Sequence, residues 1–256
     1  MGGKRNFFRN RGSAEIPIFA FSFRLYVPTY TGDCCIVTRS SDSATQSIGF
    51  VAGVLDIASL ETFCSGTDGY VTTWYNQGSS GVNCVLKTGT AGGKIVTSGT
   101  TDKLNGKPII AVTDWQFEIN DGTALTDLTG FYVGKLVNFR NQIQNNPSSG
   151  IFHYRVVNTG FSFRHGGGPI PAYTVTSSFT TQSIVGFVCA SSTDCYCVHQ
   201  GVDLGKSAID FNASFGNIFH MSNVAGNYQE LVYYNTAHVS DYVAMSTTIN
   251  SYYGAY

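Results

Sequence analysis

The sequence predicts an all-β fold, a sandwich of two antiparallel sheets with one or two short helices. Charged residues make up only 12% of the 256 residues, while glycine occurs 29 times. This composition is typical of many short strands joined by turns, and not of helices with charged faces. Apolar residues account for 43% of the chain, so a substantial core can be buried.

Strand-like runs rich in β-branched and aromatic residues follow one another at even intervals. Turn signals such as Asn105-Gly106 and Asp121-Gly122 separate them, and this spacing indicates a sandwich. The runs lie at residues 16–27, 35–39, 71–75, 108–112, 130–137, 150–157, 160–164, 184–190, 195–200, 217–221 and 230–234.

Two short helices are expected among the strands. Asp56 should cap the first, because an N-cap carboxylate accepts hydrogen bonds from free helix amides. Ser240 should cap the second and Gly254 should end it, since glycine readily adopts the left-handed conformation at a helix C-terminus. Apolar residues recur at helical spacing at Ile57, Leu60, Phe63 and Cys64, and again at Tyr242, Met245, Ile249 and Tyr252.

Charge is distributed unevenly along the chain. Four of the 15 basic residues lie within the first twelve, and residues 13–256 carry 11 positive against 16 negative charges. We therefore expect no nucleic-acid partner, and no apolar run long enough for a secretion signal or a membrane span is present. The predicted organisation is a basic N-terminal anchoring arm over residues 1–15 and one jelly-roll domain over residues 16–256.

Three short segments carry a resemblance to a known family. Residues 30–32 read Tyr-Thr-Gly, residues 39–44 read Arg-Ser-Ser-Asp-Ser-Ala, and residues 74–77 read Trp-Tyr-Asn-Gln. Together they resemble the opening of the α-L-arabinofuranosidase B catalytic domain and of its non-catalytic relatives in bacteriophage virion proteins. The resemblance implies a concanavalin-A-like, laminin-G-like jelly roll.

The same resemblance implies catalytic carboxylates that this sequence does not place where expected. Such enzymes use a Glu nucleophile in an Asp-Leu-Glu-Asn-Gly-like segment and an Asp acid before the closing strand, and retaining hydrolysis needs both, about 5 Å apart. Residues 221–224 read Met-Ser-Asn-Val, and Asn76 stands where the family has Asp. None of the four glutamates lies in such a segment: Glu15, Glu61, Glu118 and Glu230. We therefore expect no catalytic residues, no enzymatic activity and no cofactor.

The sequence thus favours a non-enzymatic bacteriophage virion structural protein, such as a head fibre, spike, decoration or tail component. It would be made in the bacterial host cytoplasm and would assemble with copies of itself and other virion proteins. Two alternatives remain open, an arabinofuranosidase-like glycoside hydrolase and a free carbohydrate-binding lectin. The residues expected to anchor the arm on a partner are Lys4, Arg5, Phe7, Phe8, Arg9 and Arg11.

Binding of host-surface glycans is the secondary expectation, because flat aromatic rings stack on the apolar faces of sugars. The candidate residues are Tyr75, Asp114, Trp115 and Gln116. No membrane partner is expected.

The cysteines are interpreted as free, buried thiols, because seven is an odd number. Cys195, Cys197 and His199 would share one strand face, with Cys189 across a hairpin. This group could hold zinc. A single strand gives poor tetrahedral geometry, so packing in the core is the favoured interpretation and no metal site is predicted.

Overall fold

The computed structural model describes residues 15–86, 92–112, 117–120, 127–136, 140–144, 151–157, 160–165, 172–174, 181–190, 194–208, 218–222 and 226–256. For part of these residues, including 140–144, 151–157, 160–165, 172–174 and 218–222, the description covers the backbone alone.

The first layer is a long antiparallel sheet. It begins at an edge formed from the first eighty residues and continues into strands from the middle and the end of the chain. Across the sheet the order is β3 (Thr45–Ile48), β2 (Cys35–Arg39), β6 (Gly69–Trp74), β7 (Cys84–Leu86), β13 (Phe117–Asn120), β22 (Ile218–Ser222), β15 (Arg140–Gln144), β16 (Ile151–Val157), β17 (Gly160–His165) and β18 (Ala172–Thr174).

The second layer centres on three nine-residue strands, which are β23 (Gly226–Tyr234), β14 (Leu128–Leu136) and β19 (Gln182–Ala190). β1 and β12 both pair with β23, opposite β14, while β20 and β21 extend the sheet beyond β19. Because β8 pairs with both β6 and β12, the two layers are continuous at this end. The remaining strands here are β1 (Phe19–Ser22), β8 (Gly93–Thr97), β9 (Thr100–Thr101), β12 (Ile110–Val112), β20 (Asp194–His199) and β21 (Val202–Ala208).

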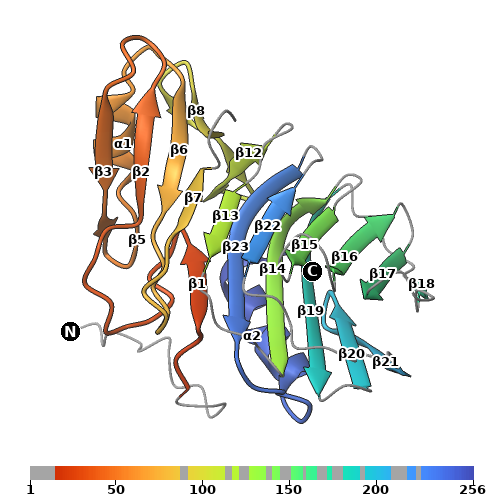
Figure 1. The fold of residues 1–256 in the computed structure, drawn as a ribbon. Helices are drawn as coiled ribbons and strands as arrows, with labels where there is room; N and C mark the ends of the chain where they lie inside the picture. The colour runs from red at the N-terminus through yellow and green to blue at the C-terminus, as the bar shows by residue number, and fades with distance from the viewer. Residues whose placement is uncertain are drawn as a thin grey trace.

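Two hairpins and two helices complete the described elements, and Figure 1 labels both helices. The hairpins pair β4 (Phe50–Val51) with β5 (Val54–Leu55), and β10 (Lys103–Leu104) with β11 (Lys107–Pro108). Helix α1 (Ile57–Phe63) lies beside β3, and α2 (Tyr242–Tyr253) packs on the second layer. Neither of these helices is long and apolar enough to cross a membrane.

Two apolar clusters stabilise the layers. The larger fills the space between the sheets, where the Phe23 ring stacks on Trp74 with centroids 4.7 Å apart. The smaller lies between α2 and the outer side of the second layer, where Met245 and Ile249 meet Phe131 and Val232. β19 is therefore buried on both faces, which explains its apolar run over residues 184–190.

The prediction of an all-β, concanavalin-A-like sandwich with two short helices is confirmed. Asp56 caps α1 by accepting a hydrogen bond from the Ser59 amide at 3.0 Å, and Gly254 ends α2 with a φ of 59°. The prediction that Ser240 caps α2 is wrong. Asp241 occupies the N-cap, and its carboxylate contacts His238 instead of a helix amide.

The apolar stripe of α2 also differs slightly from the prediction. Tyr253 is buried where Tyr252 was expected, because the Tyr253 hydroxyl reaches into the sheet. All seven cysteines are buried and free, as predicted.

Candidate functional site

The Trp-Tyr-Asn-Gln segment at the end of β6 has a structural role, because its side chains bind the backbone around β1. The Asn76 carboxamide oxygen accepts hydrogen bonds from the amides of Ala20 at 2.8 Å and Gly78 at 2.7 Å. Its nitrogen donates to the carbonyl of Ile18 at 3.1 Å and to the hydroxyl of Ser80 at 2.9 Å. A carboxylate in place of this amide could not donate the bond to the Ile18 carbonyl.

The neighbouring Gln77 has the same kind of role. Its side-chain oxygen accepts a hydrogen bond from the Tyr26 amide at 2.7 Å, and its nitrogen donates to the carbonyls of Ser22 and Arg24 at 3.2 and 2.9 Å. Asn76 and Gln77 thus fix the chain that leads into and out of β1. We call this region, residues 18–27 and 74–80, the N-terminal corner.

Glu230 lies in a closed, charged centre within the second layer. Its carboxylate accepts two hydrogen bonds from Arg24, at 2.8 and 2.9 Å, and one from the Ser22 hydroxyl at 2.7 Å. The Tyr253 hydroxyl completes the shell at 3.1 Å. Although burial disfavours the guanidinium charge, Glu230 raises the pKa of Arg24 above its ordinary value. Because Glu230 is 0% exposed, it cannot reach a substrate.

Two further glutamates also hold structural positions. Glu61 accepts a hydrogen bond from the Thr101 amide at 3.0 Å, and this bond lowers the pKa of its carboxyl group. Glu15 accepts one from the Thr236 hydroxyl at 2.8 Å and lies 3.2 Å from the His238 ring. The fourth glutamate, Glu118, is described by its backbone position in β13.

Glu118 lies in the middle of β13, on the outer face of the first layer. The register places it opposite Val85 of β7 and His220 of β22. Val85 is 45% exposed, whereas Ile119, the next residue of β13, is buried in the core. Since successive strand residues alternate between faces and paired residues share one, Glu118 and His220 belong to the outer face.

The same register extends the row across three more strands. His220 lies opposite Gln142, Gln142 opposite His153, and His153 opposite Arg164. We call this set, from Val85 through Glu118 to Arg164, the outer row. A carboxylate and an imidazole at neighbouring positions are residue types that can transfer a proton, so the outer row is our candidate site.

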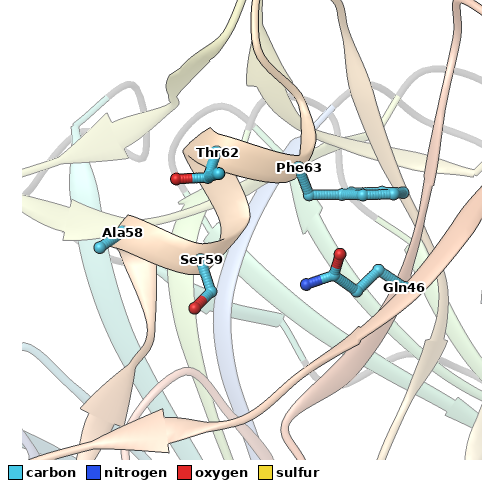
Figure 2. Close-up of a pocket in the computed structure, with 5 residues that line it drawn as sticks. All are labelled: Gln46, Ala58, Ser59, Thr62 and Phe63. Carbon is cyan, nitrogen blue, oxygen red and sulfur yellow. The ribbon is translucent and has the colours of Figure 1, made fainter.

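A separate hollow opens between α1 and β3, with a volume of about 290 Å³. Figure 2 shows the Phe63 ring and the Gln46 amide lying one above the other between helix and strand. No charged residue lines it. The lining residues are Gln46, Ala58, Ser59, Thr62 and Phe63.

Most of the site residues predicted from the sequence fall outside the described part of the chain. Tyr75 is described and half-buried, and its amide donates to the Cys34 carbonyl at 2.9 Å. Its role in glycan binding stays a prediction. The predicted residues outside the described ranges are Asp114, Trp115 and Gln116, and the arm residues Lys4, Arg5, Phe7, Phe8, Arg9 and Arg11.

The cysteines of β19 and β20 lie in the core. Cys195 pairs directly with Cys189 across the two strands, as expected. Burial raises the pKa of the Cys189 and Cys197 thiols well above their ordinary value, which disfavours the thiolate that binds metals. Within the described residues, no three potential ligands gather into a metal site.

Sequence reasoning missed the outer row because it predicted neither β13 nor β15. A signal was present, since Phe117–Asn120 alternates apolar and polar residues. Alternation over four residues does not identify the partner strand. β22 lies about a hundred residues further along the chain.

Comparison with known proteins gives one family match, and the solved structures with a similar fold include arabinofuranosidases. Residues 12–149 match the family model described as "Alpha-L-arabinofuranosidase B, catalytic". No curated protein matches the sequence.

Among solved structures, a GH54 α-L-arabinofuranosidase soaked with a cyclic sulfate inhibitor superposes with a TM-score of 0.69 and 14% identity, covering 94% of this chain and 63% of that one. An arabinofuranosidase complexed with arabinofuranosyl-α-1,2-xylobiose gives 0.68 and 15%, covering 91% and 62%. At these identities the likeness shows the fold. The chain spans less than two thirds of the length of either protein.

These matches overturn the prediction of a non-enzymatic virion structural protein. The family model describes a catalytic domain, and neither it nor the matched arabinofuranosidases carry any virion context. The error came from treating the absence of the two carboxylate-bearing family segments as the loss of catalysis. Glycoside hydrolysis requires two suitably spaced carboxyl groups, and strands distant in sequence can supply them.

Proposed function

Because this chain belongs to the α-L-arabinofuranosidase B catalytic-domain family, we propose that it is a glycoside hydrolase that releases α-L-arabinofuranosyl groups. The family match over residues 12–149, more than half of the chain, carries this proposal. The fold supports it, since arabinofuranosidases superpose over more than nine tenths of the chain.

Glu118 is the carboxylate that we assign to the reaction. Glycosidic bond cleavage uses one carboxyl group to protonate the leaving oxygen and a second to attack the sugar or to activate water. Glu118 lies on an outer sheet face beside His220. The other three glutamates each form contacts within the fold.

The second carboxyl group is assigned to an aspartate. The aspartates whose side-chain contacts the structure gives are engaged in hydrogen bonds or ion pairs, as Asp56, Asp42 and Asp68 are. Asp114, Asp121 and Asp210 lie outside the described residues. Of these, Asp114 and Asp121 are closest to Glu118 in sequence, so we propose that one of them is the partner of Glu118.

Release of 4-nitrophenol from 4-nitrophenyl α-L-arabinofuranoside tests the proposal. We expect turnover by the wild type and a loss of about 10²- to 10⁴-fold in Glu118→Gln, the usual contribution of a general acid or base. Glu61→Gln is the matched control, because its amide oxygen can still accept the bond from Thr101. It should keep full activity.

Two outcomes would contradict the proposal. Wild-type protein that releases no more nitrophenol than a heat-inactivated sample would exclude this hydrolase activity. Equal activity in Glu118→Gln and wild type would exclude Glu118. If Glu118→Gln loses activity, Asp114→Asn and Asp121→Asn are assayed in parallel as single variants. The variant that loses activity identifies the second carboxyl group.

A further inference from the structure

One side of the hollow between α1 and β3 is formed by the Phe63 ring, which Arg39 holds in place. The Arg39 guanidinium lies 5.0 Å from the centroid of the Phe63 ring and donates a hydrogen bond to the Phe63 carbonyl at 3.1 Å. Arg39 is itself held by two bonds to Asp42, at 2.8 and 2.6 Å. The ring is therefore fixed before any ligand arrives, which lowers the entropic cost of binding.

The polar groups of the hollow remain available to a ligand. The Gln46 amide and the Thr62 hydroxyl make no hydrogen bond to any residue that the structure describes. Their neighbours differ, since the Ser47 hydroxyl donates to Asp33 and Glu61 accepts from Thr101. The Ser59 hydroxyl donates to Asp56 at 2.6 Å and keeps lone pairs that can accept.

This lining selects for a particular ligand chemistry. It combines a flat apolar ring with amide and hydroxyl groups, and none of the lining residues is charged, while the Arg39 guanidinium contacts the same ring from outside the lining. A neutral sugar has the complementary form, with an apolar C–H face and a rim of hydroxyls. The volume of about 290 Å³ is just below the range of ligand pockets, roughly 300–1,000 Å³, which suits a small ligand such as one sugar unit.

We propose that this hollow is an accessory binding site for one neutral sugar residue, with Phe63 against the sugar face and Gln46 and Thr62 on its hydroxyls. β3 is separated from β13 by four strand spacings, which is about 19 Å. The hollow is thus remote from Glu118 and would bind a different unit of a polysaccharide. This inference goes beyond the proposed hydrolase and stands without it.

A nuclear magnetic resonance titration tests the site directly. The probes are methyl α-L-arabinofuranoside and methyl β-D-xylopyranoside, and the observed signal is the side-chain amide of Gln46. We expect a saturable shift with a dissociation constant on the order of millimolar for at least one probe. Using Glu118→Gln protein keeps the probe intact and separates this test from hydrolysis.

Two variants identify the binding groups. Gln46→Ala should weaken binding about fivefold, the value of one hydrogen bond, and Gln46 is exposed, so the fold is not at risk. Phe63→Leu keeps an apolar side chain but removes the flat ring, and should weaken binding further. For Gln46→Ala the signal is followed on the backbone amides of α1.

Thr45→Ala is the matched control, because Thr45 is exposed on the same strand and alternates to the other face. It should bind as the wild type does. The absence of a saturable shift with both probes would overturn the proposal, as would equal affinity in Gln46→Ala and wild type.

Discussion

The N-terminal corner and the outer row show opposite uses of polar residues. In the corner, the side chains of Asn76 and Gln77 form hydrogen bonds with backbone groups inside the protein. In the outer row, Glu118 and His220 lie at neighbouring register positions on a face turned away from the core. The Trp-Tyr-Asn-Gln segment therefore stabilises the fold, and the candidate chemistry lies on other strands, β13 and β22.

Two glutamates make the same contrast within one chain. Glu230 is held by Arg24 and closed to solvent, whereas Glu118 occupies an outer face. Substitutions in the interior should change the free energy of unfolding. Substitutions in the outer row should change activity alone. Variants in each of the two regions test this separation.

Arg24→Ala should reduce the free energy of unfolding by about 3–5 kcal/mol, because it leaves the Glu230 carboxylate buried without its partner. Urea denaturation followed by circular dichroism measures the loss. The double variant Arg24→Met/Glu230→Leu should recover much of it, since no charge then stays buried. A loss below about 1 kcal/mol in Arg24→Ala would show that the buried ion pair does not stabilise the second layer.

Gln77→Glu should cost about 2–3 kcal/mol, because a carboxylate would face the carbonyls of Ser22 and Arg24 without a proton to donate. Gln46→Glu is the matched control. The same exchange at this exposed position should change stability by no more than about 0.5 kcal/mol. Equal effects at the two positions would remove the distinction between corner and surface.

His199 should make the protein less stable in acid. Burial lowers the pKa of His199 from 6.5 to about 4, so the unfolded chain binds a proton between these values while the folded chain does not. Stability therefore falls as the pH drops through this window. In His199→Gln the fall between pH 7 and pH 4 should be smaller by about 2–3 kcal/mol. Unfolding curves at the two pH values measure it, and identical falls in both proteins would contradict the assignment.

His220→Ala should have the smallest effect on stability, within about 0.5 kcal/mol, as expected for an outer-face position. It should nevertheless slow arabinofuranoside hydrolysis, because His220 lies opposite Glu118. Thermal unfolding and the nitrophenol assay on the same sample give both values. A large loss of stability with unchanged turnover would place His220 in the structural class with Asn76.

The sequence predicted the bounds of individual strands and helices better than it predicted which strands pair with each other. β2 has the bounds 35–39 that were expected from its β-branched residues, and α1 begins after Asp56 as expected from the cap. Such features depend on residues a few positions apart, so local patterns encode them. Ser240 was a poor guide for α2, because a serine next to an aspartate leaves two equally good caps and tertiary contacts with His238 decide between them.

The outer row could not be derived in the same way. Glu118 and His220 are about a hundred residues apart, and their proximity depends on β22 inserting between β13 and β15. The alternation of each strand shows which residues share a face, but not which strand lies next to it.

By itself, then, the sequence determined the all-β class, the start of α1 after Asp56, and the end of α2 at Gly254 in the left-handed conformation. It also determined the resemblance of its first eighty residues to the arabinofuranosidase family. Only the tertiary structure decided that Arg24 pairs with Glu230 across 206 positions, that Asn76 binds the backbone around β1, and that Glu118 lies on an outer face. The physical reason is that periodicity and capping act over one or two turns of backbone. The order of strands depends instead on how the whole core is buried at once.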